Sequence, residues 1–187
     1  MNQQSTYSLV IFLPQRETDT VADVKSDVCK RVGWFNSRNS DAHITVWEGC
    51  ANEDKLKLIV AKISEFTNFL SPVQIAFSSS QIGDNGAFFL IPEQFDKKKL
   101  VEMFKDIYKI LPVKRTSGSF SPHISIARGL EASQIAVVRE RFSGFRLPLS
   151  FVCSEVCLRK HDEIARQFVI IDRFSFQGKE NPQLKLF

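Results

Sequence analysis

Two short stretches of this 187-residue chain repeat one pattern of side-chain chemistry, and they constrain its fold and function more than any other feature. Each begins with a histidine, followed by an apolar residue, a hydroxyl residue and a second apolar residue; His43–Val46 reads HITV and His123–Ile126 reads HISI. In a β-strand, successive side chains point to opposite faces. If both stretches are strands, each places its histidine and hydroxyl on one face and its apolar residues on the other.

This arrangement suits acid–base chemistry at a phosphate. The apolar face of each strand must be buried, which leaves the histidine and the hydroxyl to line a cleft. Two imidazoles that titrate near neutrality can divide proton transfer, one acting as a base and the other as an acid. The hydroxyls of Thr45 and Ser125 can donate hydrogen bonds to phosphate oxygens where negative charge accumulates. The pair of motifs therefore predicts His43 and His123 as catalytic residues.

The hydrophobic pattern predicts both helices and strands. Apolar residues at helical spacing indicate helices over 20–32, 53–69, 96–110 and 132–142. Extended apolar stretches, separated by turn signals, indicate strands over 7–13, 43–47, 73–82, 87–91, 123–127, 147–159 and 165–176. The segment Gly83–Gly86, GDNG, is typical of a hairpin turn between two of them.

The order of these elements suggests an internal duplication. After each histidine strand come a helix, a long strand, a turn and an apolar strand, and a glycine follows each histidine by six residues, at Gly49 and Gly129. The halves of the chain therefore echo each other.

Length and composition favour a single compact unit over residues 1–187, with 178–187 as a peripheral tail. The chain is 43% hydrophobic and 25% charged, as in typical globular proteins, and no segment has the apolar run that a membrane span needs. The N-terminus lacks the positive region of a signal peptide, so we expect a cytoplasmic protein. We also expect it to be a monomer. The formal charge of +4 permits an anionic substrate without requiring one. The four cysteines fit no zinc or redox spacing and are expected to be free thiols.

The second motif carries a resemblance to a known family. The stretch Ser121–Arg128, SPHISIAR, is similar to one in the two-histidine (2H) phosphoesterases, which include bacterial RNA 2′,5′-ligase-like proteins and eukaryotic cyclic phosphodiesterases. The resemblance covers about residues 7–176 in element order. It implies an α+β, bilobal fold with two pseudo-symmetric lobes, each with an antiparallel sheet flanked by helices, and an active-site groove between them. The first motif departs from the family pattern, because Trp47 and Glu48 follow where an apolar continuation is usual.

The same resemblance implies an activity. His43 would be the general acid and His123 the base that activates water, acting without a cofactor or metal on a 2′,3′-cyclic phosphate or a 2′,5′-phosphodiester of a nucleotide or RNA end. An RNA-end or nucleotide binding protein of the same fold, with little turnover, is the alternative. A metal hydrolase is poorly supported, because the sequence shows no clustered carboxylate and histidine ligands.

Charged residues near the second motif are further candidates for substrate binding. Arg128 follows His123 by five residues, an odd offset that places it on the opposite strand face unless the strand twists or ends. Both a phosphate contact and a surface ion pair therefore stay open for Arg128. Lys114 and Arg115 lie in a loop before the motif, where they either cover an anionic substrate or remain solvated charges.

Aromatic residues near the expected groove are candidates for stacking on a base. Tyr7, Trp47 and Phe120 lie close in sequence to strands that should line the groove, although most aromatic side chains in such a chain belong to the core. His161 falls in a predicted polar turn and is expected to be exposed to solvent.

Overall fold

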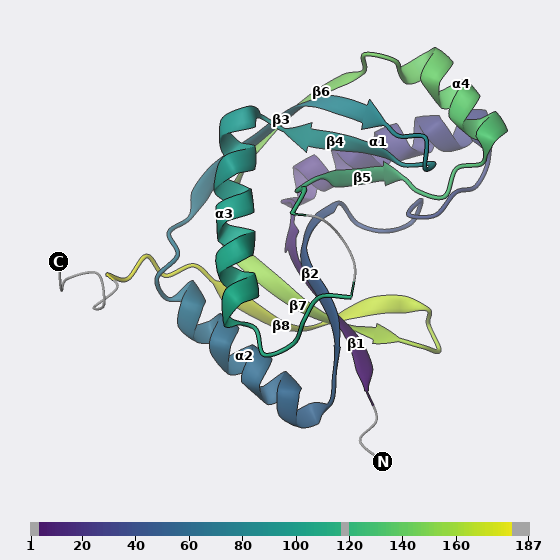
Figure 1. Cartoon of the computed structure of the whole chain (residues 1–187). Helices are drawn as coiled ribbons and strands as arrows, with labels where there is room; N and C mark the ends of the chain where they lie inside the picture. The colour runs from purple at the N-terminus through teal and green to yellow at the C-terminus, as the bar shows by residue number, and fades with distance from the viewer. Residues whose placement is uncertain (1–3, 117–119, 181–187) are drawn as a thin grey trace.

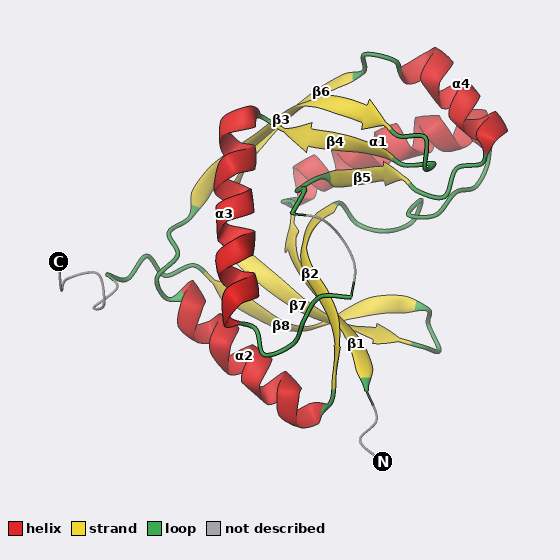
Figure 2. Cartoon of the chain, viewed as in Figure 1, coloured by secondary structure: helices red, strands yellow, loops and turns green. Residues whose placement is uncertain are grey.

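The structure is a computed structural model, and it describes residues 4–116 and 120–180. Its strands are β1 (Ser5–Phe12), β2 (His43–Ala51), β3 (Val73–Ile82), β4 (Phe88–Pro92), β5 (Ile124–Ala127), β6 (Arg146–Cys153), β7 (Glu155–Asp162) and β8 (Gln167–Ser175). Its helices are α1 (Gln15–Val32), α2 (Glu53–Thr67), α3 (Gln94–Ile110) and α4 (Ala132–Phe142), shown in red in Figure 2. The predicted mixture of helices and strands is confirmed.

All the named strands belong to one antiparallel sheet with the order β6-β3-β4-β5-β2-β1-β7-β8. The sheet has two four-stranded halves, and they meet where β5 pairs with β2 through Ile44 and Ile124. These two residues directly follow His43 and His123 in the sequence. The bilobal α+β prediction is confirmed, with the refinement that the sheets of the two lobes are continuous at the histidine motifs.

The helices cover the two halves in a crossed arrangement (Figure 1). Helix α1 connects β1 with β2, yet it packs against β5, β6 and α4 in the other half. Helix α3 connects β4 with β5 and packs against β2 and α2, while also contacting β3 and β4. Each of these long helices therefore reaches the histidine strand of the opposite half, which ties the two lobes together.

The internal repeat in the structure differs from the one that the sequence suggested. The units β1–α1–β2 and β4–α3–β5 correspond, since each is a strand, a long helix and a histidine strand. The hairpins do not correspond: β4 of the β3–β4 hairpin lies inside the sheet beside β5, whereas β8 of the β7–β8 hairpin is an edge strand. The element order after each histidine is therefore not a spatial repeat.

The predicted strand over 147–159 is in fact two strands. β6 pairs with β3, β7 pairs with β1, and the chain crosses from one half of the sheet to the other at Ser154. The Ser154 carbonyl accepts a hydrogen bond from the Phe176 amide at 2.8 Å, outside the β6 and β7 ladders. A continuous apolar stretch does not reveal this crossing, because both strands are buried on at least one face.

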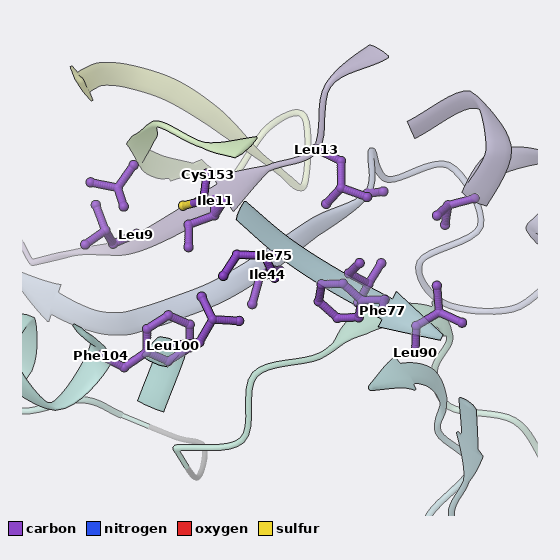
Figure 3. Close-up of a cluster of buried hydrophobic side chains, with 14 of the residues drawn as sticks. Leu9, Ile11, Leu13, Ile44, Ile75, Phe77, Leu90, Leu100, Phe104 and Cys153 are labelled. Carbon is purple, nitrogen blue, oxygen red and sulfur yellow. The ribbon is translucent and has the colours of Figure 1, made fainter. Parts of the chain in front are cut away.

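The hydrophobic core lies between the sheet and the helices and draws on both halves. Figure 3 shows Leu9 and Ile11 of β1 near Ile44 of β2 and Ile75 of β3, with Phe104 of α3 beside them. Ile44 and Ile124, the apolar neighbours of the two histidines, are fully buried. The predicted burial is confirmed for Ile44, Ile124 and Ile126, whereas Val46, the second apolar residue of the first motif, is half-buried and lines a cavity.

The C-terminal segment, the cysteines and the helix lengths test three further sequence predictions. The amides of Gly178 and Lys179 donate to carbonyls of Leu70 and Asn68, so the start of the predicted tail packs on the connection after α2, and 181–187 lie outside the described residues. All four cysteines are free, as expected, and burial raises the pKa of the Cys153 thiol to about 12. Among the described residues, none of the helices is long and apolar enough to cross a membrane.

Candidate active site

The two histidine rings are held by the same local hydrogen bond. His43 Nδ1 lies 2.7 Å from the carbonyl oxygen of Asp41, and His123 Nδ1 lies 2.8 Å from that of Ser121, two residues earlier in each case. A carbonyl oxygen only accepts hydrogen bonds, so Nδ1 carries the proton in each neutral ring. In each neutral ring Nε2 is therefore the nitrogen without a proton, the one that can accept a proton.

A phenylalanine from the neighbouring strand packs against each ring. Phe12 at the end of β1 meets His43 edge-on at 5.8 Å between ring centroids, and Phe89 of β4 meets His123 at 5.0 Å. Strands β1 and β4 are equivalent in the internal repeat, so the two rings share their packing as well as their hydrogen bonds.

A β-bulge follows the hydroxyl residue in the first motif. Leu9 of β1 pairs with Trp47 and Val10 pairs with Thr45, which leaves Val46 as an extra residue in β2. An extra residue breaks the alternation of faces and re-aims the side chains beyond it. Trp47 consequently turns toward the core, where it is 2% exposed.

The second motif has its bulge at the same place. Phe88 of β4 pairs with Ala127 and Phe89 pairs with Ser125, so Ile126 is the extra residue in β5. In each motif the residue after the hydroxyl is therefore the extra residue of a β-bulge. The position five residues after each histidine then returns to the histidine face, and it is occupied by Glu48 in the first motif and Arg128 in the second.

The motif side chains converge on one cavity of about 280 Å³. It is lined by Ser37, Ser40, Asp41, His43, Thr45, Val46, Trp47, Glu48, Arg115, Ser121, His123, Ser125 and Arg128. A larger cavity of about 850 Å³ extends toward the β7–β8 hairpin and shares part of this lining, namely Ser37, Ser40, Asp41, His43, Thr45, Glu48 and Arg128. Both histidines and both hydroxyls therefore face one groove, as the alternation within each motif predicted.

Arg128 lines both cavities, although its odd offset from His123 argued against that position. The bulge at Ile126 adds one unpaired residue to β5, so the side chain of Arg128 lies on the same face as that of His123. The Arg128 amide also donates to the Asn36 carbonyl at 3.0 Å, which fixes the end of β5 against the loop after α1. Of the two possibilities that the sequence left open, the groove position is the one that the structure shows.

A buried arginine that the sequence analysis missed stands beside His43. Arg159 of β7 is 8% exposed, and its Nη2 atom lies 3.1 Å from Ser8 Oγ and 3.3 Å from His43 Nε2. Its guanidinium also lies over the rings of Phe12 and Phe168, at 5.6 and 4.9 Å from their centroids. Within the described residues no carboxylate forms an ion pair with it.

Burial, together with this contact, keeps His43 uncharged. Burial and the neighbouring Arg159 guanidinium lower the pKa of His43 to about 3, against the smaller opposing effect of the Asp41 carbonyl. Burial also lowers the pKa of Arg159, to about 10, so the guanidinium remains charged at neutral pH. His43 is therefore a neutral imidazole whose Nε2 accepts a hydrogen bond from Arg159.

Lys25 of α1 holds the loop that walls the groove. It is 2% exposed, and its Nζ donates to the carbonyls of Ser37 at 3.0 Å and Ser40 at 2.6 Å. Burial lowers the pKa of Lys25 to about 8. Ser37 Oγ in turn donates to the carbonyl of Ile126 at 3.2 Å, so the loop is tied to the bulge of the second motif.

Replacement of Lys25 tests this positioning role. Lys25→Met leaves two loop carbonyls without their charged donor, so we expect the free energy of unfolding to fall by about 2–3 kcal/mol. KM should rise because the groove wall loosens. Chemical denaturation and steady-state kinetics check both results, with Lys30→Met, an exposed lysine on the same helix, as the control. Unchanged stability in Lys25→Met would contradict this role.

Of the predicted binding residues in the loop before β5, Arg115 lies at the smaller cavity and Lys114 does not. Arg115 lines the smaller cavity, and its guanidinium lies 4.2 Å from the Phe120 ring centroid, so Phe120 supports Arg115. The loop is attached to β2, because the Thr116 amide donates to the Glu48 carbonyl at 2.9 Å. Lys114 is exposed and is not among the residues that line either cavity.

The structure buries both Tyr7 and Trp47, and only Trp47 lines the candidate cavity. Tyr7 is 3% exposed and belongs to the core, so it is not placed to stack on a base. The Trp47 ring touches the wall of the smaller cavity, but it is buried over Gly49, where any Cβ atom would overlap it. The bulge at Val46 turns the Trp47 side chain toward the core. The sequence pattern does not reveal this bulge.

His161 was predicted in an exposed turn, and this is also wrong. β7 continues to Asp162, the turn follows over 163–166, and His161 is half-buried. Its ring meets Phe168 edge-on at 5.2 Å between centroids, and it lines the larger cavity.

The sequence does carry weak signals for the missed residues. Arg159 follows three buried residues, Val156–Leu158, where a strand core is apolar. Lys25 lies one turn from Val21 and Val28 on the apolar stripe of α1. A charge that interrupts an apolar pattern is a candidate for a specific buried contact. Among the described residues, no three His, Cys, Asp or Glu side chains are grouped as metal ligands would be.

The comparisons with known proteins agree with this geometry. The family model described as the 2′-5′ RNA ligase superfamily matches residues 12–165. The chain belongs to the 2′-5′ RNA ligase superfamily. The resemblance to 2H phosphoesterases is thereby confirmed at the level of the superfamily, whose members are generally phosphodiesterases or ligases. A search of curated protein sequences finds no match.

Solved structures share the superfamily fold over nearly the whole chain. Escherichia coli LigT complexed with NADP+ matches with a TM-score of 0.69 at 12% identity, covering 94% of this chain and 99% of LigT. TT0787 of Thermus thermophilus matches at 0.68 and 15% identity, covering 94% of this chain and 100% of TT0787. Kluyveromyces marxianus Usb1 with uridine monophosphate matches at 0.53 and 15%, covering 91% of this chain and 98% of Usb1.

Proposed function

We propose that this superfamily member is a metal-independent phosphodiesterase that hydrolyses a 2′,3′-cyclic phosphate or a 2′,5′-phosphodiester of a nucleotide or RNA end. One observation carries the proposal: His43, His123, Thr45 and Ser125 line the same cavity, with each histidine fixed through Nδ1 so that Nε2 is the unprotonated nitrogen of the neutral ring. Two such imidazoles and two hydroxyls supply the proton transfers and the anion contacts that cleavage of a phosphodiester needs.

The chemistry follows from these positions. With the phosphate in the smaller cavity, Thr45 and Ser125 donate hydrogen bonds to its non-bridging oxygens, where charge increases in the transition state. Arg128 and Arg115 add positive charge on the cavity wall. One histidine takes a proton from the attacking water, the new P–O bond forms, and the other histidine protonates the ribose oxygen that leaves.

The hydrogen bonds favour His43 as the base and His123 as the acid, the reverse of what the family resemblance implied. His43 Nε2 accepts a hydrogen bond from Arg159, so this atom has a lone pair and no proton, and it can take a proton from water once the contact with Arg159 is released. A bound phosphate anion would offset the charge of Arg159 and make His43 more basic when substrate is present. Within the described residues His123 Nε2 has no hydrogen-bond partner, so its ring is free to carry and deliver a proton.

The structural relatives support a nucleotide as the substrate. E. coli LigT has been crystallised with NADP+ and with 3′-AMP, and K. marxianus Usb1 with uridine monophosphate. A nucleotide-binding protein with little turnover would have no need of both histidines and both hydroxyls in one cavity. All four are present here.

The test is turnover in excess chelator on a panel of 2′,3′-cyclic nucleoside monophosphates and 2′,5′-linked dinucleotides. We expect hydrolysis that does not depend on added metal, with ³¹P NMR of the products reporting which ribose oxygen keeps the phosphate. Activity that chelator abolishes and Mn²⁺ or Zn²⁺ restores would contradict the mechanism. Binding of these compounds by calorimetry without turnover would favour the alternative binding role.

The hydroxyls make a separate prediction. Thr45→Val and Ser125→Ala each remove one donor to the phosphate, so we expect kcat to fall on the order of 100-fold with little change in thermal stability. Steady-state kinetics on the preferred substrate check this. Thr20→Val, on the first turns of α1, removes a hydroxyl outside the groove and should leave kcat unchanged. Equal kcat in Thr45→Val and wild type would refute the assigned role.

A further inference from the structure

The groove continues well beyond the histidines. The larger cavity, of about 850 Å³, runs from His43 to the β7–β8 hairpin, whereas the cavity that holds both histidines measures about 280 Å³. Pockets for compact organic ligands usually measure about 300–1,000 Å³. The cavity that holds both histidines therefore lies below this range, whereas the larger cavity, here called the distal arm, lies within it.

The distal arm is rich in unpaired positive charge. It is lined by Arg38, Arg128, Arg159 and Arg166, against the carboxylates of Asp41 and Glu48. In the described ranges, none of these four arginines forms an ion pair. A concave surface with this balance attracts a polyanion.

Arg159 is the buried charge in the arm that is placed to contact an anion. Its side chain is more than nine-tenths buried and lines the cavity, yet its Nε has no hydrogen-bond partner and its two Nη2 contacts are to uncharged groups. The Glu48 carboxylate favours the charged guanidinium but forms no ion pair with it, and burial still lowers the pKa of Arg159. A buried charge without a paired counter-charge is costly to keep. A phosphate oxygen in the arm would supply the paired negative charge that the guanidinium lacks.

The arm also carries aromatic surface. Trp34 is 68% exposed and lines the cavity on the side of the loop after α1, and Phe168 lines it on β8. An exposed tryptophan beside a basic groove is the arrangement on which nucleic-acid bases stack. In Figure 1 the turn of the β7–β8 hairpin projects on the same side of the molecule as the loop between α1 and β2.

We infer that the distal arm binds a further nucleotide of a single-stranded oligonucleotide whose reactive phosphate lies between His43 and His123. This inference rests on the proposed function and narrows it. The substrate class is an oligonucleotide end, and a cyclic mononucleotide fills only the smaller cavity. Arg159 binds the phosphate next to the reacting one, and Trp34 stacks on the base.

The test compares a uridine trinucleotide ending in a 2′,3′-cyclic phosphate with uridine 2′,3′-cyclic phosphate. The wild type should have the higher kcat/KM on the trinucleotide. Trp34→Ala should lower that value about ten-fold, in line with the loss of one stacked base, and change kcat/KM on the mononucleotide less than about two-fold. Phe95→Ala removes an equally exposed aromatic, 71% exposed on α3, and should change neither.

The charge of the arm is tested through salt dependence. Arg166 lies at the hairpin turn with φ 51°, so Arg166→Asn removes the charge while keeping a residue that tolerates this backbone. It should reduce the slope of log KM against log salt for the trinucleotide by about 0.7. Arg16→Asn, an exposed arginine at the start of α1, is the control.

A binding measurement that needs no turnover distinguishes failure of this inference from failure of the proposed function. A uridine dinucleotide with 5′- and 3′-phosphates should quench the fluorescence of Trp34, and the quenching should disappear in Trp34→Phe. If no compound is hydrolysed but this quenching occurs, the arm stands and the proposed function fails. If both cyclic phosphates are hydrolysed with equal kcat/KM, and Trp34→Ala affects them equally, the inference is overturned and the proposed function stands.

Discussion

His43→Ala and His123→Ala each lower kcat by roughly two to four orders of magnitude in excess chelator, because each removes one of the two groups that move protons in the transition state. The double variant should be little worse than either single variant, since residues that act as a unit do not contribute additively. Steady-state and single-turnover kinetics on the preferred substrate of the panel check both results.

Folding must be monitored beside activity. Both rings are half-buried at the groove and are not part of the hydrophobic core, so the circular dichroism spectra should match the wild type. Added imidazole should restore part of the activity of each alanine variant, because it can occupy the space and carry the proton. A folded His123→Ala protein with more than a tenth of the wild-type kcat would refute the two-histidine mechanism.

Arg159→Met raises the pKa of His43 above its wild-type value of about 3, because it removes the guanidinium that donates to Nε2. The pKa should remain below the ordinary histidine value, since burial is the larger cause of the shift. Lys25 and Arg128 also lower it and are unchanged in the variant. A pH titration of the histidine ring signals by NMR measures the shift, and Arg159→Lys, which keeps a charge, should move it less.

The sign of the effect on activity follows from the role of His43 as a base. A base works in its neutral form, and in the free wild-type protein His43 stays neutral well below pH 5. The acid limb of kcat/KM should therefore not arise from His43 in wild type, whereas Arg159→Met should gain an acid limb at the raised pKa. Titration of His43 near pH 6–7 in the free wild-type protein would contradict both the contact and the assignment.

The sequence alone determined the chemistry of the site. A histidine and a hydroxyl two residues apart share a strand face whatever the rest of the fold does, because side chains alternate along an extended chain. The apolar residues between them require burial, so Ile44 and Ile124 had to face the core. Local periodicity also located the helices well, with α4 at Ala132–Phe142 as predicted.

Only the tertiary structure decided which other residues join the histidines. The bulges at Val46 and Ile126 depend on how β2 and β5 pair with β1 and β4, so the sequence pattern could not show that Trp47 turns inward and Arg128 turns toward the groove. The break at Ser154 depends in the same way on two different partner strands.

The buried charges depend on contacts across the chain. Arg159 meets His43 and Ser8 from 116 and 151 residues away in sequence, and no local pattern encodes such a meeting. Lys25 can be buried in an apolar stripe because its ammonium group donates hydrogen bonds to two carbonyls of the loop after α1. Local alternation is a property of the backbone and can be derived from the sequence, whereas strand pairing and the burial of a charge are set by which distant segments the fold brings together.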